Sequence, residues 1–132
     1  MKNLIAFLLL FSCSISVLYA AEPATVVAPT SNATNNYVLY PTTNYYTFLK
    51  LDTRNGRIWQ VQYSMDDNEF ECILNENELV SDGKPGQFAL YPTTNNWTFI
   101  LLDTINGDTY HVQWSQDKDK RGIFRIRLSI YS

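Results

Sequence analysis

The sequence is poor in cysteine and histidine, with two cysteines and one histidine in 132 residues. Cys13 lies in an N-terminal apolar segment, and without that segment Cys72 has no partner for an internal disulfide. Spacings typical of metal ligands, a glycine-rich phosphate loop and a nucleophile elbow are all missing. We therefore expect no metal, no cofactor and no catalytic residues, and we predict that the protein is not an enzyme.

Basic charge is also scarce, since ten Lys and Arg stand against 13 Asp and Glu, for a net charge of −3. Binding to nucleic acid requires clustered Lys and Arg that neutralise phosphates, so no nucleic-acid partner is expected. The charge is uneven, because residues 66–82 hold seven acids and no base, whereas residues 118–127 hold five bases and one acid. Two solvated edges are the simpler interpretation; the alternative is that the two segments attract each other, within the fold or between subunits.

Residues 1–21 are typical of a signal peptide, with Lys2 before a long apolar run and small residues at Ala20 and Ala21. They predict an exported protein that is periplasmic, secreted or associated with the outer membrane. A second interpretation is a bacterial lipobox ending at Cys13, whose lipid anchor would be the protein's one contact with a membrane. An uncleaved anchor is marginal, because the apolar stretch barely reaches the roughly 20 residues of a span.

Residues 22–36 form a polar segment without aromatic residues or sustained periodicity. Such a segment cannot bury enough apolar surface to order itself, so we predict a disordered linker. The remaining residues 37–132 are predicted to form a single β domain.

An internal duplication is the strongest pattern in the chain. The sequence Leu-Tyr-Pro-Thr-Thr-Asn at residues 39–44 recurs at residues 90–95, and the same offset of 51 continues without a gap to Ser115. The two repeats are predicted to span residues 37–80 and 88–132, with a three-residue insertion after Ser115. That insertion aligns Phe70 with Phe124, Cys72 with Ile126 and Leu74 with Leu128.

Each repeat is predicted to contain about four short antiparallel strands. Proline ends the first strand, β-branched and aromatic residues fill the second, and Asn-Gly forms a tight turn before the third. Asp52 and Asp103 are expected to accept backbone hydrogen bonds in these turns rather than to act in catalysis. The predicted strands cover residues 37–40, 45–51, 58–63 and 70–74 in the first repeat, and 88–91, 97–102, 109–114 and 123–130 in the second.

The third strands alternate between apolar and polar residues, which is typical of an antiparallel sheet with one wet face. We expect the aromatic side to lie in the core and the polar side to face water. The predicted core residues are Trp59, Val61 and Tyr63 in the first repeat and Tyr110, Val112 and Trp114 in the second; the predicted polar faces are Ile58, Gln60 and Gln62, and Thr109, His111 and Gln113.

The second strands are apolar on both faces, which favours a position between two layers or at an interface. One repeat alone would expose an apolar face, and two repeats can cover each other. We predict an all-β fold in which the duplicated unit forms a pseudo-two-fold sandwich or small barrel. The alternative is that each repeat is a propeller blade, which requires oligomerisation because two blades cannot close a ring.

Amide side chains beside flat aromatic rings suggest a binding surface. Rings stack on the apolar face of a sugar, and amides pair with its hydroxyl groups. The alternative is that the rings belong to the core and the glutamines form a solvated ladder across the strands. The candidate ligand-binding residues are Gln60, Gln62, His111, Gln113, Tyr45, Tyr46 and Trp97.

The segment that contains the turn has a distinctive sequence, which is TFLKLDTRNGRIWQVQ at residues 47–62 and WTFILLDTINGDTYHVQW at residues 97–114. It resembles the unit fLxLDTrnGriWqvqws of small exported two-repeat proteins from Bacteroides-type gut bacteria. The resemblance implies a location in the bacterial envelope and an all-β fold, and it carries over no catalytic residues. The second repeat departs from it at residues 108–110, so a surface that requires Arg-Ile-Trp would exist only once.

These observations predict a non-enzymatic, exported binding or interaction module of the bacterial cell envelope, with a protein or a glycan as its partner. One alternative is an oligomeric, lectin-like carbohydrate-binding protein with sugar sites between blades. Another is an inhibitor or immunity protein against a secreted toxin or hydrolase, which would use the acidic residues 66–82 as its contact.

Overall fold

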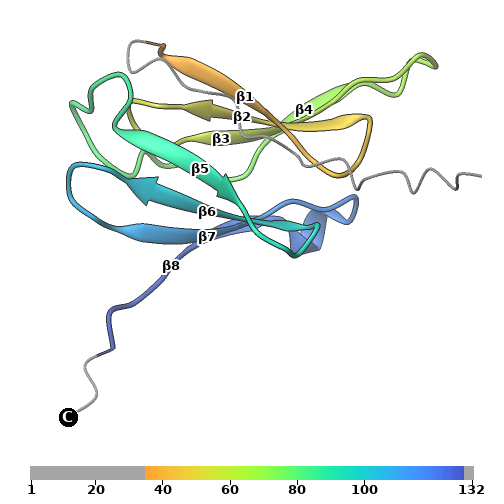
Figure 1. The fold of residues 1–132 in the computed structure, drawn as a ribbon. Coiled ribbons are helices and arrows are strands. Elements are labelled where there is room, and N and C mark those ends of the chain that lie inside the picture. Colours follow the sequence, from red (N-terminus) through yellow and green to blue (C-terminus); the bar gives the residue numbers. More distant parts are fainter. Residues whose placement is uncertain (1–34, 130–132) are drawn as a thin grey trace, which may run out of the picture.

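Two antiparallel β-sheets stack as two layers in the computed structural model, which describes residues 35–129 (Figure 1). The predicted signal peptide, Cys13 and the linker up to residue 34 lie outside the described residues. The all-β prediction is confirmed, as a sandwich of two units that does not close into a barrel. No helix within residues 35–129 is long and apolar enough to cross a membrane.

Each repeat forms one sheet whose four strands follow one another in chain order. The second strands begin two residues later than predicted in the first repeat and one later in the second, because the preceding residues form a turn. The last strand is also shorter than predicted and ends at Arg125. The first sheet contains β1 (Tyr37–Pro41), β2 (Thr47–Asp52), β3 (Ile58–Gln62) and β4 (Phe70–Ile73); the second contains β5 (Phe88–Pro92), β6 (Thr98–Asp103), β7 (Thr109–Gln113) and β8 (Gly122–Arg125), with a short 3-10 helix η1 (Lys118–Lys120) before β8.

The turns between the second and third strands have the predicted aspartate caps, but only the glycine of each Asn-Gly pair adopts a positive φ angle. In the first repeat, the Gly56 amide donates to the Asp52 carbonyl at 3.0 Å, and the Asp52 carboxylate caps the turn by accepting from a backbone amide. In the second repeat, the Asp103 carboxylate accepts from two backbone amides at 3.0 Å each. Gly56 and Gly107 have positive φ angles of 76° and 77°, a conformation that favours glycine.

The two sheets pack front to back. We call the side of each sheet that carries Tyr40 and Leu49 in the first repeat its A face, and the opposite side its B face. The core forms between the A face of the first sheet and the B face of the second. The first sheet contributes Val38, Tyr40, Leu49, Leu51 and Ile58; the second contributes Phe88, Leu90, Phe99, Leu101, Tyr110, Val112 and Trp114.

This packing confirms the predicted core face of the third strand in the second repeat and corrects it in the first. Ile58 and Gln60 are fully buried, whereas Trp59 and Val61 are half-buried on the open B face. Tyr63 is 47% exposed. A strict two-fold axis between the repeats would bury the same face of both sheets. Here the A face of the first sheet and the B face of the second are buried, so the second repeat is stacked on the first in the same orientation.

The alignment of the fourth strands also differs from the prediction. Phe70 pairs with Gln62 in the first sheet, and Gly122 pairs with Gln113 in the second. Backbone pairing therefore makes Phe70 the counterpart of Gly122, with an insertion of one residue rather than three. Alternating apolar residues fit any even shift of register, so the pattern by itself did not fix this alignment.

Candidate functional site

The loops after the first and third strands of both repeats gather at one end of the sandwich, which we call the loop end. Two contacts join the loops of the two repeats there. The Thr43 hydroxyl donates to the Asn96 carbonyl at 3.4 Å, and the Gln116 amide donates to the Thr47 hydroxyl at 3.5 Å. The loop end is therefore one continuous surface with contributions from both repeats.

Each repeat places an aromatic pair at the loop end. Tyr46 lies against Tyr63 with ring centroids 5.5 Å apart, and their counterparts Trp97 and Trp114 are 4.7 Å apart. Trp114 is only 1% exposed and its indole N–H donates to a backbone carbonyl at 3.1 Å. Trp97 is 45% exposed and Tyr46 53%. The exposed ring of each pair keeps surface available for a ligand.

A hollow lies beside each aromatic pair. Its volume is about 600 Å³ in the first repeat and about 470 Å³ in the second. The two hollows are built alike, because six lining residues of one are counterparts of lining residues of the other, and five of these six pairs are of similar chemistry. The five similar pairs are Tyr46 and Trp97, Gln62 and Gln113, Tyr63 and Trp114, Ser64 and Ser115, and Asp66 and Asp117; the sixth pair is Met65 and Gln116.

The serine and aspartate of each hollow are held by the same local bond. The Asp66 amide donates to the Ser64 hydroxyl at 3.0 Å, and the Asp117 amide donates to the Ser115 hydroxyl at 3.1 Å. The Gln62 side-chain oxygen is buried and has no hydrogen-bond partner among the described residues. Gln62 therefore lines the first hollow with a side chain whose oxygen is buried beneath the surface.

The hollows differ in their charged and flexible residues. Met65 lines the first, where Gln116 lines the second. Lys120 lines only the second, where its ammonium lies 3.6 Å from the Asp117 carboxylate. The second hollow thus has the larger rings and more hydrogen-bonding groups.

The structure brings four of the predicted site residues into the hollows, namely Tyr46, Gln62, Trp97 and Gln113. Tyr45 is 88% exposed at the loop end but lines neither hollow. His111 lies on the open A face of the second sheet, with its ring 5.9 Å from Phe124.

Gln60 departs most from its predicted role, because it is fully buried between the sheets. Its amide nitrogen donates to the Ser115 carbonyl at 3.1 Å, and its oxygen accepts from the Ser115 amide at 3.2 Å. The Gln60 amide nitrogen and oxygen both bond the backbone of the second repeat, and the side chain is buried, so Gln60 is not available to a ligand.

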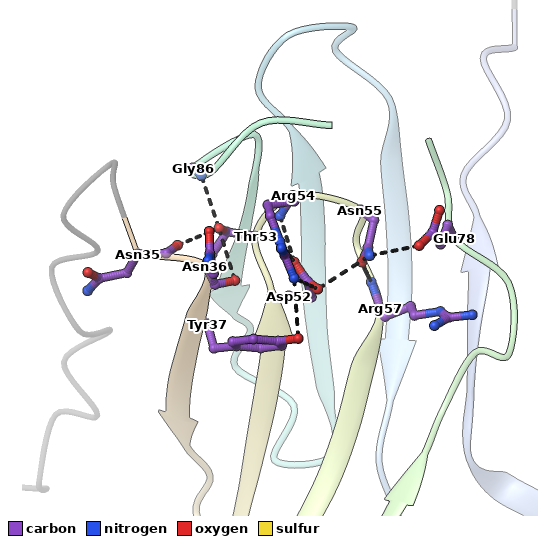
Figure 2. A network of polar contacts seen from close by, with 10 residues as sticks. All are labelled: Asn35, Asn36, Tyr37, Asp52, Thr53, Arg54, Asn55, Arg57, Glu78 and Gly86. Atoms are coloured by element: carbon purple, nitrogen blue, oxygen red, sulfur yellow. Dashed lines mark hydrogen bonds and ion pairs between the residues drawn. The ribbon is translucent and has the colours of Figure 1, made fainter. Parts of the chain in front are cut away.

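A polar network lies at the opposite end, around the turn after β2 (Figure 2). The Asp52 carboxylate accepts from the Arg54 side chain at 2.8 and 2.9 Å and from its amide at 3.0 Å. Burial raises the pKa of Asp52, but these bonds and the Arg54 charge outweigh burial and leave the pKa below its ordinary value. Asn55 donates to both Asp52 and Glu78. The carboxylate is therefore held ionised as an anchor of the turn.

Thr53 joins the two repeats within the same network (Figure 2). Its hydroxyl donates to the Asn35 carbonyl at 2.6 Å and accepts from the Gly86 amide at 3.0 Å. Its carbonyl accepts from the Phe88 amide at 2.8 Å, so β5 begins against the turn of the first repeat. The network is structural, and within residues 35–129 no group of three or more His, Cys, Asp or Glu side chains could hold a metal.

No known protein family matches the chain, and no curated protein or solved structure is significantly similar to it.

Proposed function

We propose that this chain is a non-enzymatic, exported binding module with one carbohydrate site in each repeat. The observation that carries the proposal is the same hollow built twice, with an aromatic pair, a carboxamide, a hydroxyl and a carboxylate in equivalent places. Aromatic rings stack on the apolar faces of sugars, while the polar groups pair with sugar hydroxyls.

The two sites are expected to differ in affinity. Trp97 is a larger ring than Tyr46 and packs on Trp114, which is itself buried. In the first repeat the supporting ring, Tyr63, is half exposed and less firmly held. A ligand loses less freedom on a pre-organised platform, so we expect tighter binding in the second repeat.

Substitution of the exposed rings tests the sites. Binding of sugars retained on a glycan array is measured by titration calorimetry for the natural chain and for Trp97→Ala, Tyr46→Ala and the double variant. Loss of a central aromatic contact weakens binding by about 2 kcal/mol, or roughly thirtyfold in affinity. We expect Trp97→Ala to remove the tighter site, Tyr46→Ala the weaker one, and the double variant to lose both.

Ile105→Ala is the matched control, because Ile105 is 62% exposed in the turn between β6 and β7, away from the hollows. Its binding should equal that of the natural chain. Binding that survives the double substitution would refute the location of the sites. A chain that retains no sugar on the array would refute the ligand class.

A further inference from the structure

The two outer surfaces of the sandwich are the counterparts of the two surfaces packed inside it. The A face of the first sheet covers the B face of the second, which leaves the B face of the first sheet and the A face of the second open. Both open faces are rich in apolar side chains. Tyr37, Leu39 and Trp59 lie on the open B face, and Tyr91, Ile100 and Phe124 lie on the open A face.

Equivalent residues are buried in one repeat and exposed in the other. Leu39 is 49% exposed, whereas its counterpart Leu90 is 2% exposed. Tyr91 is 50% exposed, whereas its counterpart Tyr40 is 2% exposed. Contiguous apolar faces of this kind on a soluble domain mark interaction surfaces. Here their strand order and pairing match those of the inner junction, because both sheets come from the same repeated unit.

Two hydrogen bonds cross the inner junction between the sheets, and the equivalent donors and acceptors on the open faces are not bonded to each other. The Leu90 amide donates to the Tyr40 hydroxyl at 3.4 Å, and the Phe88 amide donates to the Thr53 carbonyl at 2.8 Å. Both donors lie on an edge strand, where amides without a partner invite pairing with another chain. The counterpart pairs, which form no such bond within residues 35–129, are the Leu39 amide with the Tyr91 hydroxyl and the Tyr37 amide with the Thr104 carbonyl.

We propose that a second copy of this chain binds front to back, with the A face of its second sheet on the open B face of the first sheet. Such a contact uses different surfaces on the two partners, so it leaves a free face at each end until a ring closes. Propellers close with about four to eight four-stranded blades, and each chain supplies two, so the ring contains two to four chains. This inference does not depend on the class of ligand that the hollows bind.

Several positions differ between the inner and the proposed junction, and the largest changes in polarity are Lys50 for Leu101, Glu71 for Ile123, Thr109 for Ile58 and His111 for Gln60. Lys50 replaces Leu101 on the open B face, but it lies 4.8 Å from the centre of the Trp59 ring and pairs with Glu71, so its charge is balanced within its own chain. His111 replaces Gln60 on the open A face. A neutral imidazole offers one donor and one acceptor, the two kinds of group that Gln60 presents to Ser115.

Single charges on the open faces test the proposal. Leu39→Asp changes the B face and Tyr91→Asp changes the A face, and both side chains are half exposed in the subunit. Masses of the exported chain and the variants are measured by native mass spectrometry and light scattering over a broad concentration series. We expect one species of two, three or four chains for the natural protein. Each variant should be monomeric, because a charge buried in the junction weakens association at least about a hundredfold.

Mixing the two variants is the decisive step, because each retains the face that the other lacks. A mixture should form a species of two chains, whereas each variant alone stays monomeric. Ile105→Asp is the control, since Ile105 is outside both faces, and it should assemble like the natural chain.

A natural chain that stays monomeric would overturn the proposal, as would a variant that still assembles alone or a mixture that does not form the pair. Circular dichroism checks that each variant is folded, and Tyr37→Ser and Phe124→Ser replace any variant that is not. Sugar binding is measured separately on the monomeric variants, so failure of the ring and failure of the ligand sites are distinguished.

Discussion

Replacing Gln60 with leucine tests how the two repeats are joined. The glutamine is fully buried and makes two hydrogen bonds with the backbone of Ser115, at 3.1 and 3.2 Å. Leucine is similar in size and apolar, so Gln60→Leu removes these bonds while leaving the packing nearly filled. The expected result is a fold that survives but is less stable.

The expected loss of folding free energy depends on which hydrogen bonds Ser115 keeps in the Gln60→Leu variant. Its carbonyl still accepts from the Arg121 side chain at 2.6 Å, but its amide loses its partner and stays buried. A buried unsatisfied donor destabilises a fold by about 1–3 kcal/mol, so we expect a loss of about 2 kcal/mol. For a domain of this size each kcal/mol shifts Tm by about 4–8 °C, which gives a decrease of roughly 8–16 °C.

Thermal unfolding followed by circular dichroism at one protein concentration measures this decrease. Gln62→Leu is the matched control, because Gln62 lies on the same face of β3 and its side-chain oxygen has no partner among the described residues. Its stability should stay equal or rise, because the substitution removes a buried oxygen that has no hydrogen-bond partner among the described residues. Equal Tm values for Gln60→Leu and the natural chain would refute the reasoning, as would equal damage from both substitutions.

Further predictions concern the two turns after the second strands. Gly56→Ala should destabilise the fold by about 1–2 kcal/mol more than Gly107→Ala in urea denaturation, because an added Cβ at Gly56 would lie 2.7 Å from Leu79 and one at Gly107 would meet nothing within 4 Å. Equal losses would show that positive φ alone matters. Burial raises the pKa of Asp103, but hydrogen bonds from Asn106 and its neighbours outweigh burial and lower the pKa overall. The ionised carboxylate therefore stabilises the fold above the ordinary pKa of about 3.9, and this contribution is lost as pH falls through the lower native pKa. Asp103→Asn should reduce stability at neutral pH and flatten its loss in acid; parallel pH curves for both proteins would contradict this.

Much of the fold could be predicted from local patterns. Proline after the first strand, Asn-Gly after the second and alternation in the third each act over a few residues, and all eight strands are present. The duplicated turn at Asp52 and Asp103 was predictable for the same reason, because a side chain that caps its own turn needs no distant partner.

The buried face of the first sheet could not be predicted, because both faces of β3 carry apolar side chains. Trp59 and Val61 made one face the apparent core, and Gln60 on the other face argued against burial. What allows Gln60 to be buried is the backbone of Ser115, which is 55 residues away in the sequence. A long-range partner for a single amide leaves no trace in the periodicity of its own strand.

The candidate site was predictable in part. The sequence points to Tyr46 and Trp97 as rings next to polar loops, whereas its alternation places Tyr63 and Trp114 in the core and does not indicate that they line the hollows. The available signal was the shared order of amide, aromatic ring and serine at residues 62–64 and 113–115. Its placement opposite Tyr46 and Trp97 depends on how the strands pair, which the repeat alone does not specify.

Because the A face of one repeat packs on the B face of the next, further repeats could be added to the chain in the same orientation. Two copies fused in tandem, with a connection copied from residues 81–86, would place the open A face of the first copy against the open B face of the second. Every added copy brings both halves of the proposed joint, as in solenoid proteins, with Lys50 and Glu71 standing there in place of Leu101 and Ile123. Tandem fusions of increasing length therefore provide a series in which size changes while the same two kinds of joint alternate.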